Sequence, residues 1–389
     1  MKIAILTEIL STHSGSRAPI ELAKYLALNN KVTLIAYDLQ TEQDIKKELK
    51  TRGIEIILIR PPDFVFGKWL AAFRFLPYLQ NQDIISFHGT LPALLVAKLS
   101  GKPIVKTYYG TQLNAYLEKF LPFEPLSKKD KCLHWLSNKV ILFMERVNFF
   151  IAKQTIGISQ YTSKEAQKYY GLKIPFIHLD ASVISSTLNP ISSKARNKVL
   201  RQKSEVLIPY TLDPITILSV SRITPYKGFH LLIEAVKKIG KKINLIIVGS
   251  SPQPKYLEYL RKIKTAQVKI LINISDRELA SLYQNCDIYV SADRYLFFGL
   301  PPLEAAFFGK PSVILDHCAA GEVVNHQKTG YVCKDLNELI KYLKILVENQ
   351  NLREKMGQDA KNFAIENFSW EQTAKNYEAV FTNIITGNK

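Results

Sequence analysis

The chain has 389 residues, of which 47% are hydrophobic and 22% charged, so it is long enough for two globular domains and too apolar for a disordered protein. Its formal net charge is +18, and 29 Lys and Arg stand against 16 Asp and Glu in the first 205 residues. Such a field attracts phosphates and anionic surfaces. No zinc-finger spacing, aromatic RNA-binding strand or basic zipper accompanies the charge, so we expect no nucleic-acid partner.

The cysteines and the first residues of the chain are informative about the cellular compartment of the protein. The four cysteines are widely spaced without a C-x-x-C pair, which signals neither a structural zinc site nor a disulfide framework. The first apolar run meets Glu8 at once, unlike a signal peptide, and no apolar stretch reaches the roughly 18 residues that a membrane span needs. We therefore expect a cytoplasmic protein.

Apolar runs alternate with amphipathic stretches along the first half of the chain. They predict strands at 3–6, 32–36, 54–59, 84–87 and 104–107, and helices at 19–28 and 92–99. This alternation is typical of an α/β fold with a doubly wound parallel sheet.

Two segments of this half mix aromatic and basic residues. They are residues 64–78, and residues 127–131 with the apolar stretch that follows to 150. Such a mixture suits a helix lying on an anionic membrane, which makes the protein peripheral on the cytoplasmic face. The alternative is a helix that packs its aromatics into the first domain and leaves its lysines in solvent.

The second half repeats the alternation after residues 185–205, where Ser, Asn, Pro and cations replace periodic apolar residues and indicate a linker. Predicted strands are 215–220, 243–248, 268–272, 288–290 and 312–315; predicted helices are 229–239, 255–263, 276–284 and 302–308. A last helix is expected over 370–384, with Ser369 as its N-cap. We expect domains at 1–190 and 191–368, and a C-terminal helix within 369–389 that packs near the first domain.

The junction between the predicted strand 215–220 and helix 229–239 carries two cations, Arg222 and Lys227. Backbone N–H groups and the helix dipole favour an anion at such a place, so the pair predicts a diphosphate site. Glu304, downstream, is suited to accept hydrogen bonds from ribose hydroxyls. Together they suggest a sugar nucleotide. The alternatives are a solvated basic turn, and a glutamate that serves only as the dipole partner in a first helical turn.

Five ordered segments of the second half resemble those of glycosyltransferase family 4. They are residues 219–235, 248–250, 282–288, 298–305 and 321–330. The resemblance covers almost the whole chain and implies the GT-B fold, two Rossmann-like domains facing across a cleft, with the terminal helix crossing back to the first. It implies a hexosyltransferase that moves a sugar from a nucleotide-diphosphate sugar to a glycan or lipid-linked acceptor, with retention of configuration. No D-x-D triplet occurs, so we expect no metal and no cofactor beyond the donor substrate.

The resemblance also assigns residues. Arg222, Lys227 and Glu304 would act in catalysis by neutralising the leaving diphosphate and holding the donor. Further donor-binding positions are Gly15, Gly249, Phe298, Gly299 and Leu300, and His88, Tyr109 and Ser159 would lie on the sugar and acceptor side. For Ser159 an ordinary helix N-cap is the competing role, and for His88 a structural hydrogen bond.

The chain departs from the family pattern at sugar-facing positions. Leu296 stands where the first glutamate of E-x7-E is usual, Tyr109 replaces a histidine, and Asp180 replaces an asparagine. Two other classes therefore stay open: a catalytically weak or silent sugar-nucleotide-binding protein, and a GT-B epimerase or phosphorylase. The sequence does not specify donor base, donor sugar, acceptor or oligomeric state.

Overall fold

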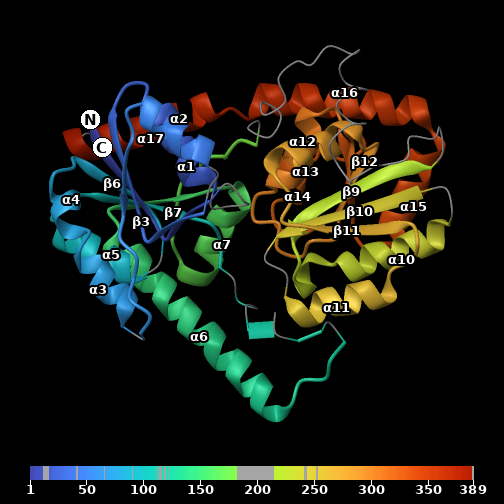
Figure 1. Ribbon diagram of the computed structural model, residues 1–389, viewed down its shortest axis with the longest axis horizontal. Coiled ribbons are helices and arrows are strands. Elements are labelled where there is room, and N and C mark those ends of the chain that lie inside the picture. The colour runs from blue at the N-terminus through green and yellow to red at the C-terminus, as the bar shows by residue number, and fades with distance from the viewer. Residues whose placement is uncertain are drawn as a thin grey trace. The chain divides into compact units, whose positions relative to one another are not determined.

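The computed structural model describes residues 1–11, 17–40, 43–64, 66–89, 91–111, 113, 116–117, 120–121, 123–181, 214–240, 243–250 and 253–387. The chain forms two compact units (Figure 1). The first comprises Met1–Leu117, Pro125–Asp180 and Phe368–Lys389, and the second comprises Glu118–Glu124 and Ala181–Asn367. The linker predicted at 185–205 and the boundary at 190 lie outside the described residues.

The first unit is built on a parallel sheet in the order β5-β3-β1-β6-β7-β8. Its strands are β1 (Lys2–Thr7), β3 (Lys31–Ala36), β5 (Glu55–Leu58), β6 (Ile84–His88), β7 (Ile104–Tyr108) and β8 (Gln154–Gly157). Two short strands, β2 (Ile9–Ser11) and β4 (Asp38–Gln40), follow β1 and β3 in the chain and form a separate parallel pair. In chain order the main sheet runs 3-2-1-4-5-6, the Rossmann order, which reverses direction between β1 and β6.

Helices cover this sheet. They are α1 (Ala18–Leu26), α2 (Gln43–Thr51), α3 (Gly67–Phe73), α4 (Leu76–Gln80), α5 (Leu91–Leu99), α6 (Lys128–Ile151), α7 (Gln160–Tyr170) and α17 (Trp370–Thr386). Helix α5 contacts α3, α4 and α6, so these four form one layer. The central strands are buried on both faces, as expected for a parallel sheet between helical layers.

The C-terminal helix α17 is fixed to the first unit by long-range hydrogen bonds. The backbone N–H of Trp370 donates to Asp180 Oδ2 at 3.1 Å, and Thr373 Oγ1 donates to the carbonyl of His178 at 2.8 Å. Farther along, the Tyr377 hydroxyl lies 3.0 Å from Thr107 Oγ1. Asp180 therefore serves as an anionic partner for the positive end of α17.

The second unit repeats the architecture, with a parallel sheet in the order β11-β10-β9-β12-β13-β14. Its strands are β9 (Ile215–Arg222), β10 (Ile243–Ser250), β11 (Val268–Ile272), β12 (Ile288–Ser291), β13 (Ser312–Leu315) and β14 (Gly330–Cys333). Its helices are the short η3 (Pro225–Lys227), then α10 (Phe229–Ile239), α11 (Pro254–Ile263), α12 (Asp276–Asn285), α13 (Leu300–Phe307), α14 (Ala320–Val323), α15 (Leu336–Glu348) and α16 (Gln350–Asn367). The order reverses between β9 and β12, which defines the switch point where ligands of such sheets bind.

The predicted elements agree closely with the structure. All ten predicted strands are present, and the helix at 229–239 has the predicted bounds. Strands β2, β4, β8 and β14 escaped prediction, because none of them shows a clear alternation of apolar and polar residues. No helix within the described residues has the length and apolar character to cross a bilayer.

Candidate functional site

Two cations meet at the carboxyl end of β9, beside the switch point of the second sheet. Arg222 is the last residue of β9, and Lys227 ends the short η3 that follows. The ring of Tyr226 lies close to both: the Arg222 guanidinium carbon is 5.8 Å and Lys227 Nζ 5.0 Å from its centroid. Arg222 also donates a hydrogen bond to the Tyr226 hydroxyl. An aromatic ring thus holds the two positive groups together, and its π face favours cations.

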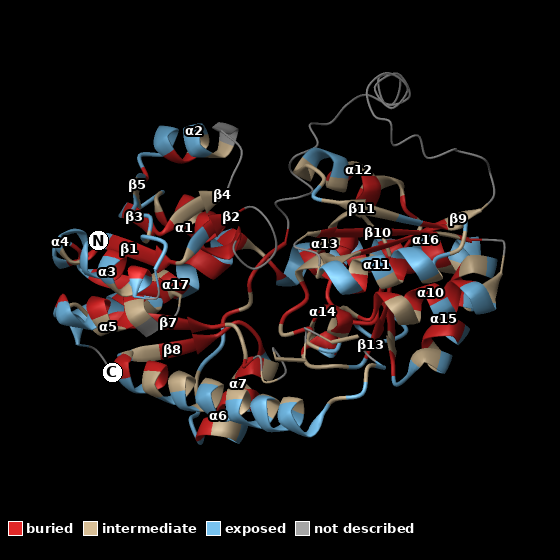
Figure 2. Cartoon of the chain, turned by 60° about the horizontal axis from the view of Figure 1, so that its bottom comes forward, coloured by how far each residue is buried: buried red, intermediate tan, exposed pale blue. Residues whose placement is uncertain are grey.

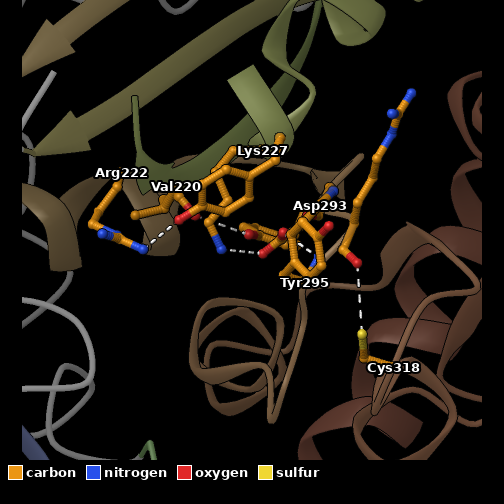
Figure 3. A network of polar contacts seen from close by, with 10 residues as sticks. Val220, Arg222, Lys227, Asp293, Tyr295 and Cys318 are labelled. Atoms are coloured by element: carbon orange, nitrogen blue, oxygen red, sulfur yellow. Dashed lines mark hydrogen bonds and ion pairs between the residues drawn. The ribbon is translucent and has the colours of Figure 1, made fainter. Parts of the chain in front are cut away.

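Asp293 supplies the negative partner of Lys227 (Figure 3). It follows β12, the strand beside β9, and is 6% exposed. Its Oδ2 forms an ion pair with Lys227 Nζ, while its Oδ1 accepts the backbone N–H of Tyr295 at 2.8 Å. The carboxylate is therefore oriented by the loop after β12 and aimed at the cation.

Gly228 allows the chain to turn from η3 into α10. It has φ +71°, and an added Cβ would lie 2.4 Å from the carbonyl oxygen of Ala292. In the first turn of α10, the backbone N–H of His230 already donates a hydrogen bond to the Tyr256 hydroxyl of α11, at 3.1 Å. The same hydroxyl lies 2.8 Å from His230 Nδ1. An anion in this region would thus meet the cationic side chains rather than this amide.

Glu304 lies on α13 and is held by a buried tyrosine. The Tyr283 hydroxyl donates to Glu304 Oε2 at 2.6 Å, and the Tyr283 ring stacks on Phe308 with centroids 5.7 Å apart. The expectation that Glu304 occupies a first helical turn is wrong, because α13 begins at Leu300. Glu304 is its fifth residue, where the dipole of the helix end acts less strongly.

The loop before α13 packs tightly around Leu296. Gly299 has φ +107°, and an added Cβ would lie 2.9 Å from Val323 Cγ2 and 3.3 Å from Leu296 Cδ2. Leu296 is 6% exposed and Phe298 is 3% exposed, whereas Leu300 is partly exposed at the first position of α13. The apolar residue at 296 is part of the packing that shapes this loop.

Two predicted glycine positions remain. Gly249 lies near the end of β10, and an added Cβ would come within 2.2 Å of Ile223 Cγ1. The structure thus supplies a packing reason for this glycine. Gly15 lies outside the described residues.

Two of the three sugar-side candidates, His88 and Tyr109, form a hydrogen-bonded cluster at the switch point of the first unit. His88 ends β6, and its Nδ1 lies 2.8 Å from the Tyr109 hydroxyl, while its Nε2 lies 3.0 Å from Ser86 Oγ. Burial, with the nearby Lys106 cation, lowers the pKa of His88 to about 3. Burial also raises the pKa of the Tyr109 hydroxyl well above its usual value. Both groups are neutral near pH 7.

Ser159 is the N-cap of α7. Its Oγ accepts the backbone N–H of Thr162 at 3.1 Å, and the Thr162 hydroxyl in turn lies 3.0 Å from the Ser159 backbone nitrogen. The serine is fully buried. Its geometry is that of a reciprocal capping box, which is the structural alternative expected for it.

Several site residues were not predicted from sequence. Tyr226, Asp293, Tyr283 and Tyr256 each contact a candidate residue or its helix, and only the position of Tyr226 between the two cations was a local signal. Within the described residues, no group of three or more His, Cys, Asp or Glu has a metal-binding arrangement.

Comparison with known proteins places this geometry in a family. Residues 208–363 match the family model "Glycosyl transferases group 1". Most of the second unit is thus similar to the group 1 glycosyl transferases. An uncharacterized glycosyltransferase of Methanocaldococcus jannaschii is 24% identical over 367 residues, 88% of this chain and 87% of its own length.

Another relative is matched over about half of its length. A second uncharacterized glycosyltransferase of Methanocaldococcus jannaschii is 29% identical over 213 residues, so this alignment spans 51% of each chain. Among solved structures, Anabaena HepE in complex with UDP-glucose superposes with a TM-score of 0.73 at 17% identity, covering 98% of this chain and 100% of HepE. The fold of this chain is accordingly GT-B, with two Rossmann-like units.

Proposed function

We propose that this chain transfers a sugar from a nucleotide-diphosphate sugar to a hydroxyl of a glycan or lipid-linked acceptor, as a hexosyltransferase that retains configuration. The observation that carries the proposal is the convergence of Arg222 and Lys227 on Tyr226 at the switch point of a group 1 unit. The UDP-glucose complex of HepE supports the donor class. The free cysteines support a cytoplasmic setting.

In this proposal Arg222 and Lys227 hold the diphosphate, and Glu304 accepts hydrogen bonds from the ribose. As the bond between sugar C1 and the β-phosphate oxygen breaks, negative charge grows on that phosphate, and the two cations stabilise it. The acceptor oxygen forms the new bond to C1 and passes its proton to a phosphate oxygen. The chemistry then requires neither a protein base nor a metal.

The cluster at the first switch point fits a scheme without a protein base. His88 has a pKa lowered to about 3, and the pKa of the Tyr109 hydroxyl is raised by burial, so neither is a strong base at neutral pH. Their mutual hydrogen bond of 2.8 Å instead supplies a fixed polar surface, which we propose contacts the sugar or the acceptor. Ser159 has no such role in this proposal, because its hydroxyl caps α7.

Ligand binding tests the donor assignment. Thermal unfolding is followed with UDP, GDP, ADP and dTDP and their hexose derivatives. One of them should stabilise the protein by about 2.7 kcal/mol at a hundred times its dissociation constant. Arg222→Ala and Lys227→Ala should each abolish this shift and most turnover, whereas Lys237→Ala, at the exposed last turn of α10, should keep both. Failure of every nucleotide diphosphate to bind would refute the assignment.

A silent sugar-nucleotide-binding protein is the second candidate, favoured by the buried Leu296 in place of a glutamate. Such a protein would show the same nucleotide shift with no transfer and no donor hydrolysis. A phosphorylase would instead release sugar phosphate from a glycan without nucleotide, and an epimerase would change the donor sugar without transferring it. Product analysis with the donor that binds separates the four outcomes.

A further inference from the structure

The exposed residues of α6 are either basic or, apart from Cys132, apolar. The helix runs from Lys128 to Ile151 and exposes no acidic side chain. Its exposed residues are Lys128, Lys129, Lys131, Cys132, Leu133, Trp135, Leu136, Lys139, Val140, Phe143, Arg146 and Phe150. We call this set the α6 surface.

Both acids of α6 are engaged by other groups. Asp130 accepts a hydrogen bond from the Tyr116 hydroxyl at 3.1 Å, and its backbone N–H donates to the side chain of the N-cap Ser127. Glu145 pairs at 3.4 Å with Lys106, a buried residue of β7. The five exposed cations outnumber the two acids of the helix, one of which pairs with Lys106 of β7, so the surface is positive.

Packing in the first unit does not account for the apolar residues of the surface. Only Asn148, Phe149 and Ile151, in the last turn, are buried. Residues 128–147 are exposed or half-buried, as the colours along α6 in Figure 2 show. Phe143 is 66% exposed and Phe150 is 90% exposed. Contact between such large apolar side chains and water is energetically unfavourable.

The helical period orders these residues into rows. Leu136, Phe143 and Phe150 are seven residues apart and lie in one row along the helix, about 20 Å long at about 1.5 Å per residue. Lys139 and Arg146 follow Leu136 and Phe143 by three residues, so they flank that row. Lys139 Nζ lies 5.7 Å from the ring of Trp135. An apolar row bordered by cations and an interfacial tryptophan is the pattern of a helix that lies in a membrane surface.

We propose that the α6 surface binds an anionic lipid bilayer, with the apolar row in the acyl boundary and the cations at the headgroups. Charge complementarity selects this partner, because the chain has a net charge of +18 and the surface lacks acids. Helix α3, in the same layer, adds Leu70, Phe73 and its N-cap residue Phe66, each more than half exposed. This inference rests on the proposed lipid-linked acceptor. Vesicle binding is measured without turnover, so failure of membrane binding and failure of the proposed transfer can be distinguished.

Vesicle co-sedimentation of the full chain tests the proposal. The wild type should bind vesicles of phosphatidylcholine with phosphatidylglycerol at low salt, bind pure phosphatidylcholine far less, and lose affinity as salt rises. Lys139→Gln with Arg146→Gln should weaken binding by about thirtyfold, because each cation near an anionic surface contributes about fivefold. Leu136→Gln with Phe143→Gln should weaken it by at least about tenfold while keeping good helix formers. Spin-labelled lipid should quench the tryptophan fluorescence of the wild type. Most of this quenching should be absent in Trp135→Phe.

Matched variants keep the outcome clear. Lys355→Gln with Lys361→Gln removes two exposed cations from α16 of the second unit and should leave vesicle binding unchanged. Circular dichroism and nucleotide-induced thermal shifts check that the α6 variants are folded. Equal loss in the α16 control, or no preference for anionic vesicles, would overturn the proposal. It would also be overturned if lipid-free wild type sediments as a dimer that the Leu136 and Phe143 changes dissociate, which would assign the surface to a second copy.

Discussion

Lys227 and Asp293 form an ion pair although 66 residues separate them, with the lysine side chain 12% and the aspartate side chain 6% exposed. The proposed diphosphate would approach the same ammonium group. The carboxylate therefore occupies, in the ligand-free protein, one of the directions from which a phosphate oxygen would contact Lys227. Asp293 competes with the donor and also keeps the cation in place.

Asp293→Asn should separate these two effects. It leaves a largely buried lysine without its counter-charge, so we expect the free energy of unfolding to fall by about 2 kcal/mol. The nucleotide diphosphate should then stabilise the variant more than the wild type, because it restores the missing negative charge. Thermal shifts with and without nucleotide measure both, with Glu354→Gln on α16 as the exposed control. Equal nucleotide shifts in variant and wild type would contradict the competition.

Leu296→Glu restores the family carboxylate but should not simply restore a family activity. The Leu296 side chain is 6% exposed, and an added Cβ at Gly299 would lie 3.3 Å from its Cδ2, so a charged group there would lose most of its hydration. We expect a loss of about 3 kcal/mol in the free energy of unfolding, measured by urea denaturation. Leu296→Met, which conserves volume, should cost less than about 1.5 kcal/mol. A glutamate variant as stable as the wild type, with faster turnover, would show that the loop accommodates the acid.

Tyr283→Phe tests how Glu304 is held. The change removes the hydroxyl that donates to Glu304 Oε2 at 2.6 Å and keeps the ring that stacks on Phe308. A hydrogen bond to a charged acceptor contributes about 1.5–3 kcal/mol, so stability should fall by that amount. Calorimetric affinity for the nucleotide should also drop, because Glu304 loses its orientation. Tyr259→Phe on α11 serves as the control, and unchanged affinity alongside reduced stability would limit Tyr283 to a structural role.

His88 should make stability depend on pH in acid. Its pKa is lowered to about 3 in the folded protein, below the value of about 6.5 for an unfolded chain. Between these values the unfolded chain binds a proton that the folded protein does not. The histidine's contribution is therefore complete above about pH 6.5 and is lost as the pH falls, by up to about 1.4 kcal/mol per pH unit.

Urea titrations of His88→Gln at pH 4, 5, 6 and 7 measure this contribution. The variant should lose less stability than the wild type as the pH falls through that range. His326→Gln, an exposed histidine of the second unit, should follow the wild type. Parallel pH profiles for wild type and His88→Gln would contradict a buried neutral histidine.

The amino-acid sequence by itself determined the alternation of strands and helices, because period and turn residues act over a few neighbours. Helix 229–239 and the ten predicted strands are examples, and so is the pairing of Arg222 and Lys227 in one junction. The family motifs were also readable locally, since each lies within a single strand, turn or helix. The unpredicted strands β2, β4, β8 and β14 lacked a clear alternation of apolar and polar residues.

Tertiary structure alone decided which side chains meet. Asp293 reaches Lys227 because β12 pairs with β9, and Tyr283 reaches Glu304 because α12 and α13 pack on the same unit. Folding likewise showed that Leu296 is buried, that Ser159 caps a helix and that Glu145 of α6 pairs with the buried Lys106 of β7. The physical reason is that hydrogen bonds, ion pairs and burial act through space at a few ångströms, whereas the sequence reports only separations along the chain.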